Sequence, residues 1–200
     1  MATRAPRSYH HGNLRAALLE RAEGTLRTGG AGRLSLRELA RDIGVSHAAP
    51  RRHFADKQAL LDALAHEGFE RLGRELAAAS AQAEPAFEAR LAAIAHAYVR
   101  FATRHAALLE LMFAAKHRPG ADEGLAAAAE RAFAAPRELI ADGQATGAVV
   151  GGDPERVMLV ALAGLQGLVS MANAGMIEEA ALDGLVTDAV DHVMLGLRPR

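Results

Sequence analysis

Residues 35–54, SLRELARDIGVSHAAPRRHF, predict two short helices joined by a sharp corner. The apolar positions of the first helix recur with the 3.6-residue period of one buried face: Leu36, Leu39, Ala40 and Ile43. Gly44 follows them, where a residue with positive φ ends a helix and turns the chain. A second short helix over residues 47–53 then gives the proportions of a helix-turn-helix.

The flanking residues extend this prediction to four helices within the first 80 residues. A first amphipathic helix begins near Leu14 and stops at Gly29 and Gly30. Ser35, three residues before Glu38, has the spacing of a capping box. Asp56 is a good N-cap for a long fourth helix whose apolar residues recur at helical spacing.

The rest of the chain also predicts helices only, because it is rich in Ala, Leu, Arg and Glu and shows no strand alternation. We expect further helices at about 85–103, 105–117, 121–143, 154–174 and 178–196. The expected fold is therefore all-α, with about nine helices. A three-helix unit is joined by the long fourth helix to a helical remainder.

Charge is distributed unevenly between the two ends of the chain. Residues 1–57 carry 11 Arg or Lys against 5 Asp or Glu, whereas residues 58–200 carry 12 against 19. The net charges are +6 and −7, so a near-neutral total conceals a basic amino-terminal part and an acidic remainder. Such a basic part favours a polyanionic partner such as DNA, although a merely solvated basic surface has the same composition.

Residues 157–177 contain no charged side chain over 21 positions, a length that would suffice to span a bilayer. Many of these residues are Ala or Gly and no basic flank anchors the segment, so we expect no membrane association. A helix apolar on all sides is better explained if a second subunit covers the side that its own core leaves free. The homodimer interface is accordingly predicted on a small-residue stripe and on the last helix, at Ala163, Gly167, Ser170, Ala174, Leu182, Val186, Ala189 and Val193. Packing within one chain is the alternative.

Catalytic and metal-binding patterns are not found in the sequence. The chain has no Cys, no phosphate-binding loop, no nucleophile elbow and no His-x-x-x-His pair, so we expect neither an enzyme, a metal site nor a cofactor. Its first residues lack the apolar run of a secretory signal, which favours a cytoplasmic protein.

At the level of motifs, the sequence resembles the TetR family of bacterial regulators. YHHGNLRAALLERA and LSLRELARDIGVSHAAPRRHFADKQALLDAL are similar to its amino-terminal domain without gaps. The resemblance implies a DNA-binding domain at residues 9–72 and a ligand-binding and dimerisation domain at 73–200. GQATGAVVGGDPERVMLVALAGLQGL, residues 143–168, resembles the branch with a WHG-type motif, with Gln166 and Gly167 in place of its His and Gly and its Trp absent.

The resemblance and the expected geometry of a recognition helix together assign the DNA contacts. The predicted DNA-binding residues are Ser35, Arg37, Ser46, His47, Ala48, Arg51, Arg52 and Lys57. His47 and Ala48 are expected at base edges, and the others at phosphates or groove edges. Arg51 stands where the family usually has Tyr, and Arg is the commonest reader of guanine in the major groove.

An effector cavity between helices of the body is also implied by the resemblance. The residues expected to line it are His96, Tyr98, Arg100, Phe101, Met112, Phe113, Gln166 and Asn173. The expected function is a dimeric regulator, released from a palindromic operator when a small molecule binds. A non-specific architectural DNA-binding protein and, less favoured, a helical enzyme or carrier remain the alternatives.

Overall fold

A single long helix, α3, runs through the centre of the molecule. The computed structural model describes residues 14–120 and 122–197, and over these residues the chain forms nine α-helices, two short 3-10 helices and no strand. The α-helices are α1 (Leu14–Gly29), α2 (Leu36–Asp42), α3 (Lys57–Gln82), α4 (Phe87–Arg104), α5 (Ala106–Lys116), α6 (Glu123–Ala132), α7 (Ala134–Ala145), α8 (Pro154–Asn173) and α9 (Glu179–Leu197). The 3-10 helices are Ala31–Arg33 and Pro50–Arg52.

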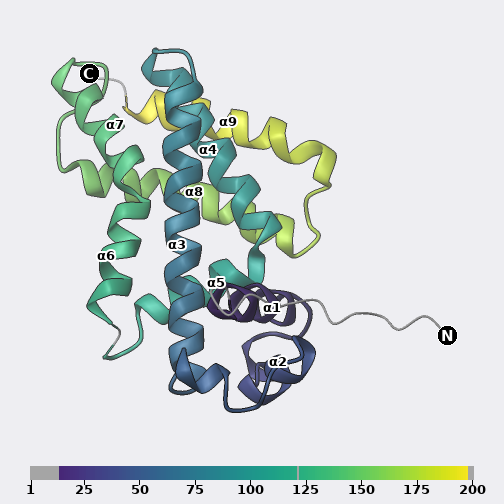
Figure 1. The fold of residues 1–200 in the computed structure, drawn as a ribbon. Coiled ribbons are helices and arrows are strands. Elements are labelled where there is room, and N and C mark those ends of the chain that lie inside the picture. Colours follow the sequence, from purple (N-terminus) through teal and green to yellow (C-terminus); the bar gives the residue numbers. More distant parts are fainter. Residues whose placement is uncertain (1–13, 121, 198–200) are drawn as a thin grey trace.

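The helices divide between a small head and a larger body. The head, residues 14–56, holds α1 and α2 at the amino-terminal end of α3 (Figure 1). The body, residues 57–197, packs α4, α5, α6 and α7 along α3. Helices α8 and α9 contact each other and α4, so they lie outside the central helix. The all-α architecture with a long connecting helix confirms the sequence prediction.

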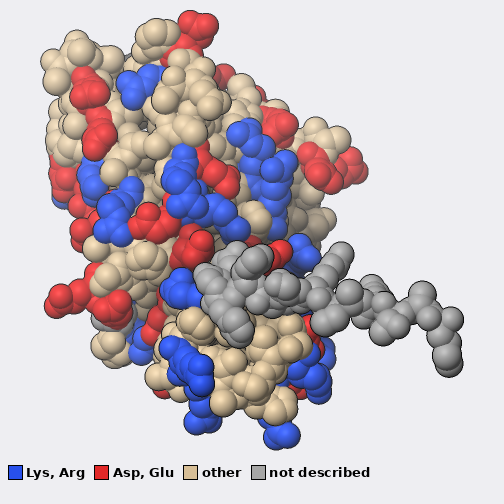
Figure 2. Space-filling model, in the orientation of Figure 1, with Lys and Arg blue, Asp and Glu red and all other residues tan. Residues whose placement is uncertain are grey.

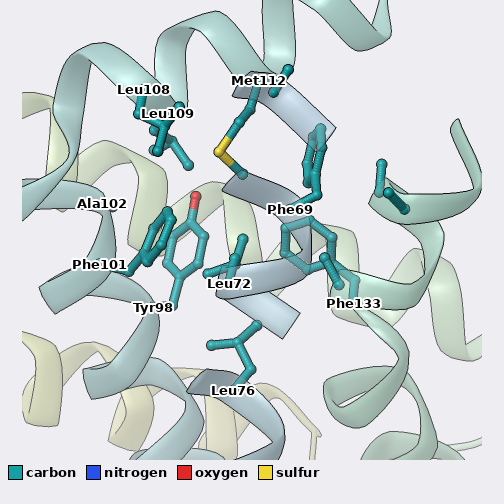
Figure 3. Close-up of a cluster of buried hydrophobic side chains, with 14 of the residues drawn as sticks. Phe69, Leu72, Leu76, Tyr98, Phe101, Ala102, Leu108, Leu109, Met112 and Phe133 are labelled. Carbon is teal, nitrogen blue, oxygen red and sulfur yellow. The ribbon is translucent and has the colours of Figure 1, made fainter. Parts of the chain in front are cut away.

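The core of the body forms where α3 meets α4 and α5. Phe69, Leu72 and Leu76 of α3 are at most 1% exposed and pack with Tyr98 and Phe101 of α4 (Figure 3). Such close packing is expected because long apolar side chains at helical spacing gather on one face of each helix. One apolar cluster continues from α1 in the head to α9 in the body. The head is therefore held on the body by shared apolar contacts.

The expected continuous helix over residues 121–143 is wrong, because the chain bends between α6 and α7. Phe133 separates the two helices with φ −102° and ψ 15°. Its side chain is buried, with its ring centroid 6.4 Å from that of Tyr98. The bend lets α6 follow α3 while α7 packs on α8, which one straight helix would not do.

The N-cap expected for α3 forms, whereas the capping box expected for α2 does not. The Asp56 carboxylate accepts a hydrogen bond from the Ala59 amide at 2.8 Å, which confirms the N-cap of α3. Asp153 caps α8 in the same manner. The expected capping box at Ser35 and Glu38 is not formed, since the Ser35 side chain makes no capping bond. The helix instead starts from the main-chain carbonyl of Ser35, which accepts from Leu39 at 2.9 Å.

Gly73 sets how closely α3 and α6 approach. A Cβ atom at this position would lie 2.9 Å from the Ala132 Cα, and main chain cannot move aside cheaply. We expect Gly73→Ala to lower the free energy of unfolding by about 1–3 kcal/mol, as overpacked cores do. Gly24→Ala is the matched control, because its Cβ would meet only a flexible Arg side chain at 3.6 Å. That change should be neutral or stabilise α1 by up to about 1 kcal/mol. Urea unfolding measures both, and equal losses would contradict the close-approach argument.

Candidate nucleic-acid interface

The corner after α2 forms as the sequence predicts. Gly44 has φ +74°, the left-handed region in which a side chain would be strained. The Val45 amide donates to the Ala40 carbonyl at 2.9 Å, so the chain turns back over the end of α2. Ala40 is fully buried, and its small side chain leaves room for this close return. The corner therefore fixes the direction in which the next segment leaves the head.

The expected α-helix over residues 47–53 is wrong, because this segment consists of consecutive turns that end in the 3-10 helix Pro50–Arg52. The Ala49 amide donates to Ser46, and the Arg52 amide donates to Ala49. Pro50 has no amide hydrogen, so it cannot make the i→i−4 bond that would continue an α-helix through this point. We call residues 46–52 the recognition turn.

Buried residues hold the recognition turn against the head. Pro50 is buried, and its carbonyl accepts from the amides of His53 and Phe54, each at 2.9 Å. The Phe54 ring is 3% exposed and lies under the Arg15 guanidinium, 5.6 Å from its centroid. The turn is thus anchored at its end, while most of its side chains remain outside.

The predicted DNA-binding residues separate into an exposed and an engaged group. Six of them are exposed: Arg37, Ser46, His47, Ala48, Arg51 and Arg52. Ser35 is half-buried. Lys57 is half-buried too, and its Nζ donates to the Gly32 carbonyl at 3.0 Å, so it closes the preceding loop onto α3.

The arginines of the exposed group have no acidic partner among the described residues. Within residues 14–120 and 122–197, no salt bridge involves Arg37, Arg51 or Arg52. Arg21, by contrast, pairs with Asp42 at 2.6 Å and ties α1 to α2. Figure 2 shows basic side chains over the free end of the head, and acidic ones mainly over the body. Guanidinium groups on an exposed turn are suited to phosphate and base contacts.

A cluster of polar contacts joins α1 of the head to the body. Glu23 of α1 accepts hydrogen bonds from Arg71 of α3 at 2.9 and 3.3 Å. The His105 ring lies against the same carboxylate, with Nδ1 3.4 Å from Oε1. Burial, followed by the charge of Arg71, holds the pKa of His105 below its usual value despite Glu23. His105 is therefore neutral near pH 7, and Arg71 supplies the charge that pairs with Glu23.

The structure brings together only part of the predicted effector pocket. Tyr98, Phe101 and Met112 are at most 2% exposed and lie in the body core, and Phe113 stands at its edge against Phe69 with ring centroids 6.2 Å apart. The other four predicted residues lie elsewhere or nearer the surface. His96 faces α9, 3.3 Å from Thr187, Arg100 and Asn173 are exposed, and Gln166 is half-buried.

A small apolar cavity of about 50 Å³ opens beside the Tyr98 ring. Its lining comes from α3, α4, α7 and α8 and from Phe133 between α6 and α7, and includes no charged side chain. Its lining includes four residues that were not predicted as pocket residues: Leu76, Leu91, Ile140 and Met158. Helical spacing can mark a residue as core, but which core residues border a gap depends on how the helices cross.

Tyr98 also gives the body a predicted sensitivity to alkali. Burial raises the pKa of Tyr98 far above its ordinary value of 10.0. Because the folded-state pKa exceeds the unfolded one, this stabilisation is complete below pH 10 and is lost as the pH rises toward the folded value. We expect the free energy of unfolding to fall between about pH 10 and 11 by up to about 1.4 kcal/mol more in the wild type than in Tyr98→Phe. Urea unfolding at both pH values measures the difference, and equal losses in the two proteins would contradict it.

Helix α8 exposes an apolar face that the body leaves uncovered. Only Val169 of this helix is buried, while Leu159 and Val160 are 61% and 76% exposed. The four predicted interface positions on this helix and just after it are all exposed: Ala163, Gly167, Ser170 and Ala174. By length and composition alone, α8 is the one helix in the described parts of the chain that could cross a membrane.

The predicted interface positions on α9 are less accessible. Leu182, Ala189 and Val193 are half-buried, and Val186 is 1% exposed within the chain's own core. Leu185 and Leu195 are exposed on this helix. A groove of about 500 Å³ lies between α8 and α9, next to Val160.

Comparison with known proteins agrees with this architecture. The family described as "Bacterial regulatory proteins, tetR family" matches residues 18–64, and "Tetracyclin repressor-like, C-terminal domain" matches residues 91–194, more than half of the chain. No match is found among curated proteins. A solved structure of a protein of unknown function from Rhodococcus sp. RHA1 is 46% identical, with a TM-score of 0.90 over 97% of this chain and 100% of that one.

More distant structures share the fold. A TetR family transcription regulator from Marinobacter aquaeolei VT8 is 17% identical, with a TM-score of 0.76 over 93% of this chain and 96% of that one. The TetR family regulator PfmR from Thermus thermophilus is 20% identical, with a TM-score of 0.67 over 91% and 99%. With its exposed basic turn and two family matches, the chain belongs to the TetR family of bacterial DNA-binding transcriptional regulators.

Proposed function

We propose that this protein is a homodimeric repressor that binds a palindromic operator and leaves it when a small molecule enters the body. The observation that carries the proposal is the recognition turn, whose arginines are exposed and form no salt bridge with any described residue. A palindromic site presents the same groove twice, which suits two copies of one head. The cytoplasm, where genomic DNA is accessible, is the proposed location.

Within each head, the position of a residue suggests which part of the DNA it contacts. His47 and Ala48 lie at its exposed start, where side chains reach base edges in related arrangements. Arg51 and Arg52 are proposed at a guanine edge or at phosphates, because guanidinium groups suit both. Arg37 and Ser35 at the start of α2 are proposed to contact the DNA backbone, and Lys57 holds the segment before them through the Gly32 carbonyl.

A symmetric dimer through α8 and α9 would cover the apolar face of the body. Leu159 and Val160 are adjacent apolar residues that are both largely exposed. Val160 also lines the groove between the two helices. Contiguous exposed apolar patches mark interaction sites. The small residues Ala163, Gly167 and Ser170 would let a partner helix approach closely, while Val186 stays within its own subunit.

Release of DNA is proposed to follow a population shift in which the effector favours a head spacing that no longer fits successive major grooves. Helix α5 contacts both α3 in the body and α1 in the head, and Glu23 joins α1 to Arg71. These contacts support a route by which a change inside the body reaches the head. Linkage then requires operator DNA to weaken effector binding by the same factor.

The experiment is competition between a selected palindromic duplex and its scrambled sequence at one salt concentration. A specific regulator should prefer the palindrome by about a thousandfold or more. An architectural protein would bind both nearly equally, and that result would overturn the proposal. A carrier or enzyme with no role on DNA would bind neither duplex.

A further inference from the structure

The Tyr98 hydroxyl is a buried polar group without a protein partner in the part of the chain that the structure describes. The side chain is 2% exposed, and no hydrogen bond to the hydroxyl is found among those residues. Buried hydroxyls are nearly always paired, because an unsatisfied one loses its bonds to water and gains none. Such an exception in a packed core calls for a physical reason.

The surroundings of the hydroxyl are apolar. Figure 3 shows it pointing toward Leu109 and Met112, on the side away from Leu76. Among the described residues the only other buried polar side chain is Ser80, and its hydroxyl already accepts from Arg90 at 3.0 Å. Buried waters usually make about three hydrogen bonds, so a water molecule here would need partners besides the phenol.

Met112 is a movable neighbour of this hydroxyl. Its side chain is fully buried and rests on α3 where Gly68 leaves space, since a Cβ there would lie 2.6 Å from the Met112 Sδ. Met is unbranched and adapts readily to a changed shape. Met112 belongs to α5, which also contacts α1 of the head. Displacing this side chain would therefore press on a helix that touches the DNA-binding part.

The cavity of about 50 Å³ on the Leu76 side of the Tyr98 ring adds room for an apolar group. Its lining includes Leu76, Phe133 and Leu165 and no ionisable side chain except the phenol. An ion placed here would lose its hydration without gaining a countercharge, so the site excludes charged molecules. The space suits a hydrocarbon body lying along the ring.

We propose that the effector is an uncharged, mainly apolar molecule with one hydrogen-bond acceptor, bound along Tyr98 with its acceptor at the hydroxyl and its body displacing Met112. This inference rests on the proposed function, because it assigns the ligand class of the same effector site. The phenol donates a hydrogen bond to the acceptor, which relieves the unsatisfied group. Movement of Met112 passes through α5 to α1.

The test uses two probes of nearly equal shape, acetophenone and α-methylstyrene, which differ in a carbonyl oxygen against a methylene group. Ligand-observed NMR titration measures their dissociation constants for the wild type and for Tyr98→Phe, without DNA. Tyr9→Phe is the matched control, since Tyr9 is the only other tyrosine in the chain. We expect the wild type and Tyr9→Phe to bind the ketone about tenfold more tightly, and Tyr98→Phe to bind both within about twofold.

Folding is checked by thermal unfolding of the same proteins. Tyr98→Phe removes an unsatisfied hydroxyl and should raise Tm by roughly 2–4 °C. Absence of a ketone preference in the wild type, its persistence in Tyr98→Phe, or no binding of either probe at millimolar concentration would each overturn the inference. Specific duplex binding by the same samples would then leave the regulator intact and only the ligand class wrong. A ketone preference without duplex binding would instead refute the regulator and keep the site.

Discussion

Val160→Asp is expected to convert the dimer into a folded monomer and to reduce operator affinity by about a thousandfold or more. Val160 is 76% exposed in the single chain, so the carboxylate costs little in the monomer. In a symmetric interface it would be buried twice, close to its own copy and without a partner charge, which costs several kcal/mol. Monomeric heads would then bind half-sites separately and lose the advantage of linked binding.

Sedimentation equilibrium and duplex titration measure the two effects of Val160→Asp. Val160→Thr is the first control, because it keeps the branched shape without a charge and should leave most of the dimer intact. Ala78→Asp is the second, since it adds the same charge at an exposed position of α3. A Val160→Asp protein that remains dimeric with unchanged affinity would remove α8 from the interface.

The double substitution Arg51→Ala and Arg52→Ala is expected to weaken operator binding by at least about a hundredfold. Both side chains are exposed, and neither forms a salt bridge with any described residue, so the head should fold unchanged. Each guanidinium is expected to contribute about 1–3 kcal/mol if it reads a base. If an arginine contacts a phosphate instead, its loss should make the slope of log binding constant against log salt concentration shallower by about one.

The matched control for this pair is Arg74→Ala with Arg100→Ala. It removes the same charge from exposed positions of the body, far from the recognition turn in the chain. Fluorescence anisotropy with selected and scrambled duplexes over a range of salt separates specific from general binding. Equal losses for the two double variants would mean that net charge alone governs binding, contrary to the assigned role of the turn.

The head could be predicted from sequence because its signals are local. Gly44 adopts the positive φ that its place after α2 required, and Asp56 caps α3. An α-helix was expected where the recognition turn forms, even though the segment contains Pro50. A proline fits the first turn of an α-helix as well as a 3-10 helix, so composition could not decide between them.

The body was predicted less completely, because its site depends on contacts between distant segments. Tyr98 and Met112 were expected to line an effector cavity, but the sequence gave no sign that the phenol would lack a partner among the described residues. His96 is on the same helix as Tyr98 and was also expected in the cavity, yet it faces Thr187 of α9. The bend at Phe133 follows from packing of α6 and α7 on different neighbours, which no local pattern records.

Selection of bound duplexes from a random pool tests the central claim most directly. The exposed recognition turn on each of two heads predicts enrichment of one palindromic sequence, with half-sites spaced for successive major grooves on one face of the duplex. Arg51→Ala with Arg52→Ala should abolish that enrichment under the same conditions. Recovery of the starting pool without any preferred sequence, at low as well as moderate salt, would contradict the account.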